Sequence, residues 1–363
     1  MSNSALLLLL ATAASAQDGL RVEFPPDSPI AVVHSGWGES RSIPRGGATV
    51  IDLRTSLKLK NLSRLRLRGI SLQVISQEVA AGGKASVSVP SLDVYPGQEF
   101  PVKIDLRLLQ PGSSGSTPQV RVQLDGALFE DLSFFGPNRL DSRRQLTAWE
   151  VEARRDRQYL RGILARQGEE ALRLKLVEIL ARDNSRPRLD VRLARSAAAL
   201  PAAARVETAF LAQPDLAVAG LRATATAHAN QLQILELAFE NRDRREVRSL
   251  ELGLLIRDSE GREFSAGSLP ARLAMRPGAS ATIQPAASLT LNRAMGLPVR
   301  IESVTSFIQQ VEFANGDVWV PPGGFRDEPR LGKLLPGSIE QQRLAEIYRR
   351  KGLHSLIEEL NHQ

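Results

Sequence analysis

The chain has 363 residues, of which 42% are hydrophobic and 24% are charged, a balance typical of folded globular proteins. It contains no cysteine, which excludes disulfide scaffolds, thiolate metal sites and cysteine nucleophiles. The formal net charge is +7, with 40 arginines and seven lysines. The whole surplus lies between Arg139 and Arg205, where 16 basic residues accompany nine acidic ones. A basic surface attracts polyanions, although charge pairs along a solvated helix face give the same composition.

Residues 1–16 predict a secretory signal peptide. The apolar stretch from Ala5 to Ala14 is ten residues long, whereas a helix needs about 20 apolar residues to cross a bilayer. Ala14-Ser15-Ala16 matches the small-residue pattern of a cleavage site. We therefore expect cleavage near Ala16 and a mature protein in the periplasm or outside the cell. The alternative is a frayed tail or a short anchor helix. No later segment is apolar enough to predict a transmembrane span.

Residues 17–137 have the pattern of β-strands. Apolar and polar residues alternate through 50–60, 70–74, 102–108 and 120–124, and Gly- and Pro-rich turns separate these runs. A period of two places one face of a strand in a core and the other in water. This segment is therefore predicted to form a first antiparallel β-sandwich.

Residues 138–182 predict a helical hairpin. There is no proline between Leu140 and Arg182, and apolar residues recur at steps of three and four. In the first helix this stripe consists of Leu146, Trp149, Ala153, Leu160, Ile163 and Leu164. Gly168 is expected to end that helix. The second helix has its own stripe, formed by Leu172, Leu176, Ile179 and Leu180.

The second half of the chain repeats this order after a segment rich in Arg, Ala and Pro. Residues 183–205 are predicted to be a linker, and residues 206–325 a second β-sandwich with a hairpin turn at 258–261. Residues 326–363 predict a second helical hairpin. Its start is marked by a capping box of Ser338 and Gln341, and Gly352 interrupts it.

The two halves also match residue by residue. Asn61 aligns with Asn241, Gly97 with Gly278, and Phe129 with Phe313, at offsets of 180, 181 and 184. Between 158–176 and 342–360, seven of 19 positions are identical. We interpret this as one ancestral sandwich-and-hairpin unit present twice. Because the matched residues belong to turns and buried helix faces, the matches predict a shared fold rather than a shared activity.

One difference between the halves concerns a turn. Asn315-Gly316 predicts a two-residue type I′ hairpin turn, in which both residues have positive φ. The corresponding pair in the first half is Asp131-Leu132, and leucine disfavours positive φ.

Sequence motifs for catalysis are absent. We find no Gly-x-Ser-x-Gly elbow, no His-Glu-x-x-His pair, no calcium-binding loop and no phosphate-binding glycine loop. His354 and His362 lie on an expected exposed helix, so no metal site or cofactor is predicted. A carboxylate pair for glycoside hydrolysis can be far apart in sequence and is left open.

The candidate partner-binding residues are five arginines and one tryptophan. The arginines lie opposite and beside the apolar stripe of the first helix, and Trp37 lies in a glycine-flanked loop that can present its ring for stacking. The set is Arg143, Arg144, Arg154, Arg155, Arg161 and Trp37. The alternatives are a solvated helix face and a tryptophan that covers the edge of the sandwich. Few aromatic residues interleave with the arginines, which argues against specific nucleic-acid binding.

We therefore predict a mainly β protein with some α-helix, a tandem duplication of an immunoglobulin- or fibronectin-like β-sandwich, each followed by a helical hairpin. The functional hypothesis is a non-catalytic, exported interaction or scaffolding protein of the bacterial cell envelope, with an envelope protein or an anionic envelope polymer as partner. One alternative is a polysaccharide-acting hydrolase. The other is a protein that binds anionic lipid through the basic central helix.

Overall fold

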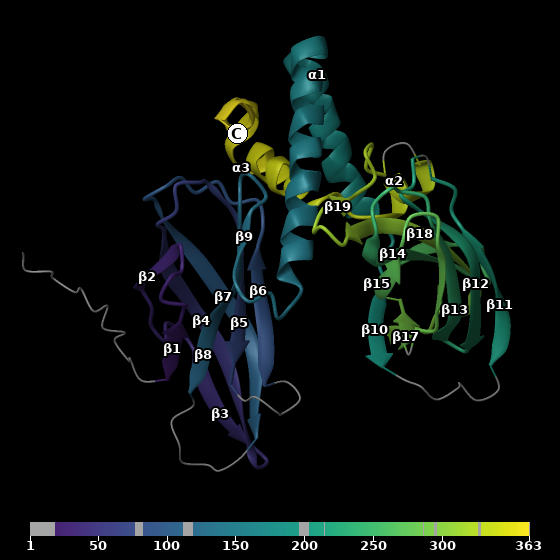
Figure 1. Cartoon of the computed structure of the whole chain (residues 1–363), viewed down its shortest axis with the longest axis horizontal. Helices are drawn as coiled ribbons and strands as arrows, with labels where there is room; N and C mark the ends of the chain where they lie inside the picture. Colours follow the sequence, from purple (N-terminus) through teal and green to yellow (C-terminus); the bar gives the residue numbers. More distant parts are fainter. Residues whose placement is uncertain are drawn as a thin grey trace, which may run out of the picture. The chain divides into compact units, whose positions relative to one another are not determined.

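The computed structural model describes residues 19–76, 83–111, 119–195, 203–213, 215–285, 287–293, 296–325 and 328–362. The predicted signal peptide, residues 1–16, lies outside these ranges. The chain divides into two compact units, unit 1 up to Leu146 and unit 2 from Thr147 onward. Both contain β-sheet, and the described part of the chain is mainly β (Figure 1). None of its described helices is both long and apolar enough to span a membrane.

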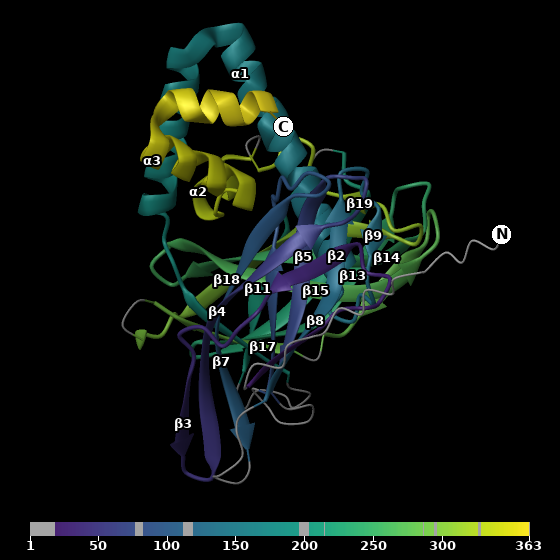
Figure 2. The same cartoon turned by 90° about the vertical axis from the view of Figure 1, so that its left-hand side faces the viewer.

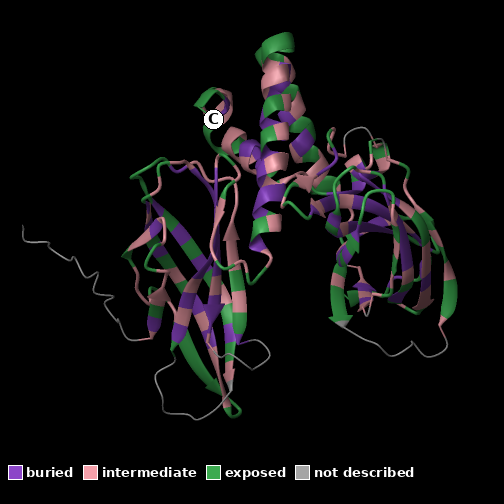
Figure 3. Ribbon diagram, viewed as in Figure 1, coloured by how far each residue is buried: buried purple, intermediate pink, exposed green. Residues whose placement is uncertain are grey.

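Unit 1 contains two sheets with a common core. The strands of the first sheet are β1 (Leu20–Glu23), β8 (Val120–Phe129), β5 (Leu67–Ile75) and β6 (Lys84–Val89), with β9 (Phe134–Phe135) paired to β8. Those of the second sheet are β2 (Ile30–His34), β4 (Ala48–Asn61) and β3 (Arg41–Arg45), with β7 (Glu99–Pro111) paired to β4. Alternate side chains from both sheets, such as Leu53 of β4 and Leu72 of β5, form the buried core. Buried positions alternate with more exposed ones along much of β4, as the sequence pattern predicts, whereas β5 is buried at nearly every position (Figure 3).

Unit 2 forms one ten-stranded, nearly closed sheet, which differs from the predicted two-sheet sandwich. The path through the sheet is β10 (Asp190–Arg195), β17 (Ala287–Asn292), β13 (Gln231–Asn241), β12 (Val218–His228), β11 (Ala204–Phe210), β18 (Ile301–Phe313), β14 (Val247–Asp258) and β15 (Glu263–Met275). Two further strands pair off this path, β16 (Ser280–Ile283) with β13 and β19 (Val318–Trp319) with β18.

The single strand β11 is the reason for this difference. Its residues 204–206 pair with β12, and its residues 207–210 pair in parallel with β18. In unit 1 the two sheets stay separate, because β1 pairs with β8 of one sheet, β2 pairs with β4 of the other, and no described strand of that unit pairs with both sheets. A strand that pairs on both sides at different points along its length joins two layers at a corner.

Part of the predicted linker, residues 183–205, is also regular structure. Helix α1 continues to Ser185, β10 pairs with β17, and β11 begins at Ala204. Leu189 and Val191 pack against the core of unit 2. The arginine and proline content of this segment obscured a short alternating pattern that is sufficient for an edge strand. Residues 196–202 lie outside the described ranges.

The helices of the described chain are α1 (Ser142–Ser185), α2 (Pro329–Leu334) and α3 (Ile339–His362). As predicted, α1 is interrupted at Gly168 (φ 81°) and α3 at Gly352 (φ 84°), so each consists of two helical arms. The leucines that match between the two halves lie in one cluster, where those of α1 pack against those of α3. Figure 2 shows α3 lying beside α1. The buried leucines of this cluster are Leu160, Leu172, Leu176, Leu344, Leu356 and Leu360. Hairpin 1, from Thr147 onward, therefore belongs to the compact unit that contains hairpin 2.

A buried asparagine organises an equivalent loop in each unit. The Asn61 side chain donates to the carbonyl groups of Leu65 and Val94, and its oxygen accepts from the amide of Ser63. Asn241 makes the same three bonds, with Arg245, Met275 and Asp243. Both asparagines are buried, and Gly97 and Gly278 each donate a backbone bond to the asparagine carbonyl of their own unit. The sequence matches at these positions therefore correspond to matching local geometry.

The turn between β18 and β19 is not the type I′ turn that we predicted. Gly316 has φ 88°, but Asn315 is not among the described residues with positive φ. The amide of Gly316 donates to the carbonyl of Phe313, and the amide of Phe313 donates to that of Asp317, which is a three-residue loop with one left-handed residue. Unit 1 has the same two bonds around Leu132, whose φ is 66°.

Replacing Leu132 by glycine is expected to stabilise the protein. A left-handed conformation costs a non-glycine residue about 1–2 kcal/mol, and the greater unfolded-state freedom of glycine offsets part of the gain. We expect a net increase of about 0.5–1 kcal/mol in the free energy of unfolding, measured by urea denaturation. The matched control is Gly316→Leu, which should destabilise unit 2. If Leu132→Gly lowered stability, packing of the leucine side chain would outweigh its backbone strain.

Candidate functional site

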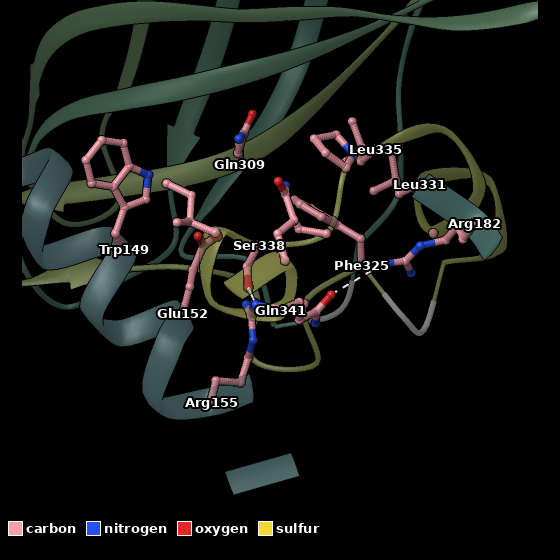
Figure 4. Close-up of a pocket in the computed structure, with 16 residues that line it drawn as sticks. Trp149, Glu152, Arg155, Arg182, Gln309, Phe325, Leu331, Leu335, Ser338 and Gln341 are labelled. Carbon is pink, nitrogen blue, oxygen red and sulfur yellow. Dashed lines mark hydrogen bonds between the residues drawn. The ribbon is translucent and has the colours of Figure 1, made fainter. Parts of the chain in front are cut away.

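Unit 2 contains a cavity of about 220 Å³ that the three helices and the sheet line together. Trp149, Glu152, Arg155 and Arg182 of α1 contribute to its wall (Figure 4). The remaining labelled wall residues are Gln309 of β18, Phe325, Leu331 of α2, Leu335, and Ser338 and Gln341 at the start of α3. The first arm of α1 presents Trp149, Glu152 and Arg155 to the cavity because residues three apart lie on one face of a helix.

A buried carboxylate fixes the position of Arg155. Asp156 is fully buried, and the Arg155 Nε donates to its Oδ1 at 3.1 Å. The Arg155 Nη1 donates to the carbonyl of Pro321 at 3.0 Å. The Ser338 hydroxyl donates to Asp156 Oδ2 at 2.5 Å, which connects α1 to the start of α3. The guanidinium of Arg155 is thus held rigidly at the cavity wall.

The predicted capping box at the start of α3 is half formed. The backbone amide of Gln341 donates to the Ser338 hydroxyl at 3.1 Å, as expected for a helix cap. The Gln341 side chain accepts a hydrogen bond from Arg182 Nη2 at 3.3 Å, which Figure 4 shows as a dashed line. The amino-terminal turn of α3 therefore faces the cavity, and its helix dipole adds positive potential there.

Glu152 is the single acidic residue among the residues that line this cavity. Within the described ranges, its carboxyl group has no hydrogen bond or ion pair. Burial raises its pKa to about 7. The nearby Arg155 opposes this increase, whereas Asp156 and Glu251 add to it. Near neutral pH the group is therefore divided between a charged acceptor and a neutral donor.

The cavity has the chemical features of a binding site for an anionic, partly apolar ligand. The Arg182 side chain has a single described hydrogen bond, to a neutral amide, so its remaining donors are available to an anion. Trp149 and Phe325 supply aromatic surface, and Gln309 and Gln341 supply amide groups. The described residues contain no cluster of three or more histidine, aspartate or glutamate side chains that could hold a metal ion.

The structure brings one of the six sequence-predicted residues, Arg155, to the cavity. Arg154 is 43% exposed and pairs with Glu150 at 2.9 Å. The Arg161 Nε donates to the carbonyl of Leu360 at 2.6 Å. A third arginine of this helix, Arg157, is buried between Glu150 and Glu340. Much of the basic charge of α1 is therefore used inside unit 2.

The other three predicted residues lie in unit 1. Arg143 is exposed, Arg144 is partly buried, and both belong to the first turn of α1. Trp37 packs partly against the core of unit 1. Its loop is attached to β4 by hydrogen bonds, among them one from the amide of Glu39 to the carbonyl of Arg54. This position agrees with the alternative of a tryptophan that covers the sandwich edge.

Sequence reasoning missed Glu152, Arg182 and Gln309. The three-residue spacing of Trp149, Glu152 and Arg155 was a usable signal, but we assigned Trp149 to the buried stripe alone. The sequence gives no such signal for Arg182. It reaches the cavity only because the break at Gly168 reverses the direction of the helix in its second arm. Gln309 lies within a strand whose pairing with β11 and β14 is long-range.

Comparisons with known proteins give no close relative. No family model matches the chain, and no curated protein matches it. Among solved structures, a β-glucosidase from Kluyveromyces marxianus covers 75% of this chain and 45% of its own, at 9% identity and a TM-score of 0.16. The chain thus spans less than half of that enzyme. Red sea bream transglutaminase has a TM-score of 0.11 at 9% identity, covering 74% of this chain and 31% of its own. These scores are too low to indicate a shared fold or activity.

Proposed function

We propose that this protein is a non-catalytic, exported binding protein of the bacterial cell envelope, and that it holds an anionic ligand in the cavity beside Glu152. The observation that carries the proposal is the guanidinium of Arg182, which lines a cavity with aromatic and amide walls and has one described neutral partner. Export to the periplasm or the extracellular space rests on the signal-like residues 1–16.

We also propose that the two halves derive from one ancestral immunoglobulin-like sandwich with a helical hairpin. The shared asparagine-centred loop, the shared parallel pairing of β1 with β8 and of β11 with β18, and the interruptions at Gly168 and Gly352 support it. In this proposal, the bridging role of β11 is a later change that converted two layers into one curled sheet.

A polysaccharide hydrolase is the second candidate, and the raised pKa of Glu152 favours it, because a general acid for glycoside cleavage needs such a value. Glycoside hydrolysis also needs a second carboxylate across the scissile bond. Glu152 is the single acid of the cavity wall, and Asp156 is buried behind Arg155. This arrangement supports binding over hydrolysis. If the wild type released reducing sugar from envelope polysaccharide and Glu152→Gln did not, hydrolysis would be favoured over binding.

Binding through the basic face of α1, to lipid or to a protein, has less support. Arg154, Arg155 and Arg161 all have partners inside unit 2. A surface that bound an anionic membrane would need these side chains to leave those partners. Vesicle binding that disappears at high salt would favour the lipid alternative.

Arg182→Gln is expected to weaken binding of a small anion by at least about tenfold, because it removes a charge-assisted hydrogen bond worth about 1.5–3 kcal/mol. The measurement is calorimetric titration of the full chain with glucuronate and inorganic phosphate, with glucose as the neutral control. Arg173→Gln is the matched variant, since Arg173 is an exposed arginine of the same helical arm that pairs with Glu170. Equal affinity of the two variants, or no anion binding by the wild type, would contradict the proposed site.

A further inference from the structure

A second cavity adjoins the first on the same unit. It has a volume of about 550 Å³, and its wall includes Arg186, Arg188 and one carboxylate, Asp190, on one side and Ser265 and Ser268 of β15 on another. Gln309, Leu335 and Pro336 line both cavities. Because three residues are common to the two walls, the cavities lie next to each other. A ligand too long for one cavity can therefore occupy both.

The second cavity has its own cationic group with unused hydrogen-bonding capacity. The Arg186 Nε is buried and has no hydrogen-bond partner in the described part of the chain. Its Nη2 lies 3.7 Å from Asp183 Oδ1, which is an ion-pair distance and longer than a hydrogen bond. Arg186 also lines the cavity and its side chain is 18% exposed, so the accessible part of the guanidinium can meet an anionic group there. Arg182 and Arg186 are four residues apart, and each lines one cavity.

The walls fit a sugar chain better than a peptide. Aromatic rings with adjacent amide groups, as Trp149 and Gln309 provide in the first cavity, suit the apolar face and the hydroxyl groups of a sugar ring. A peptide would dock by extending the sheet at its edge strand, β15. Pro270 removes one donor from that strand, and Gly267 (φ 82°) lies at an irregularity in its pairing with β14. Such an edge resists strand addition.

We propose that the two cavities form one groove that binds a chain of acidic sugars, with one anionic group at Arg182 and another at Arg186. This inference rests on the proposed function and specifies its ligand. It requires affinity to rise with the number of linked acidic residues, because the second group binds within the same molecule as the first.

The experiment is titration of the full chain with oligogalacturonides of one, two and four residues, with neutral malto-oligosaccharides of equal length as controls. We expect the tetramer to bind at least tenfold more tightly than the monomer. Arg186→Gln should remove this gain with length, whereas Arg182→Gln should weaken every acidic ligand. Arg186→Lys should retain part of the gain, and thermal unfolding checks that each variant is folded. Arg192→Gln, at a 78% exposed position of β10, is the matched control.

The possible failures are distinguishable. Monomer binding that depends on Arg182 but does not improve with length would overturn the groove and leave the proposed function intact. Absence of binding by any galacturonide, with inorganic phosphate also unbound, would overturn both. Equal binding of the malto-oligosaccharides would exclude recognition of the acidic groups. Tighter binding of oligoglutamate than of oligogalacturonide would identify an acidic peptide as the ligand and overturn the sugar assignment.

Discussion

Arg157→Met is expected to lower the free energy of unfolding by about 3 kcal/mol, the lower end of the range for breaking a buried ion pair. Arg157 is 5% exposed, and its two Nη atoms donate to Glu150 at 3.0 Å and to Glu340 at 3.2 Å. The two carboxylates are 2% and 1% exposed. Methionine would leave both in a site of low polarity with fewer donors. The cost is at the lower end because Arg154 and Arg343 stay close to these carboxylates.

The matched control is Arg154→Met, which removes the half-exposed partner of the same Glu150. A partly solvated pair of this kind contributes about 1 kcal/mol or less. The triple variant Glu150→Gln, Arg157→Met, Glu340→Gln should recover most of the loss, because it leaves no unpaired buried charge. Urea denaturation followed by circular dichroism gives all three values. Equal stability of Arg157→Met and Arg154→Met would mean that water replaces the missing donors.

This network explains why the charge surplus in the middle of the chain was a poor guide to a binding face. The sequence places several arginines on α1, and helical periodicity places them beside the apolar stripe. It does not reveal that α3, nearly 200 residues later, supplies Glu340 and the carbonyl of Leu360 as partners. Composition measures charge, whereas availability to a ligand depends on long-range pairing.

Local patterns were much more informative about the fold. The apolar stripe at steps of three and four identified Leu160, Leu172 and Leu176, which are buried. Glycine marked both helix breaks because it adopts positive φ at little cost. The curled sheet of unit 2 could not be predicted in this way. It depends on β11 pairing with β12 at one end and with β18, about 100 residues later, at the other.

The candidate site was the least predictable part, for the same reason. Its wall combines α1, which ends at Ser185, with β18, which begins at Ile301, and with the start of α3 at Ile339, so the parts of the site are far apart in the sequence. In the sequence, Glu152 is an ordinary helix residue. Its raised pKa arises from burial in the folded unit. Perturbed acids of this kind are frequent at functional sites, and their position is a property of the tertiary structure.

Glu152→Gln is expected to stabilise the protein at pH 8 by about 2–3 kcal/mol and to have little effect at pH 5. The folded-state pKa of Glu152 is about 7, above its ordinary value of 4.5, so between these values the folded state binds more protons than the unfolded state. Stability therefore falls as pH rises from about 4.5 to 7, because in this range the carboxyl group ionises in the unfolded state and is held protonated in the folded state. Glutamine stays neutral and removes this loss.

The measurement is the free energy of unfolding of wild type and variant between pH 5 and pH 8. Glu169→Gln, at an exposed position of the same helix, is the control and should leave the pH dependence unchanged. We expect the same proton to affect ligand binding, since an ionised Glu152 would repel an anion in the cavity that it shares with Arg182. Wild-type affinity for glucuronate should therefore increase from pH 8 to pH 6, and Glu152→Gln should lack this increase. If neither the stability nor the affinity of the wild type changed with pH in this range, Glu152 would be in contact with water and away from the bound anion.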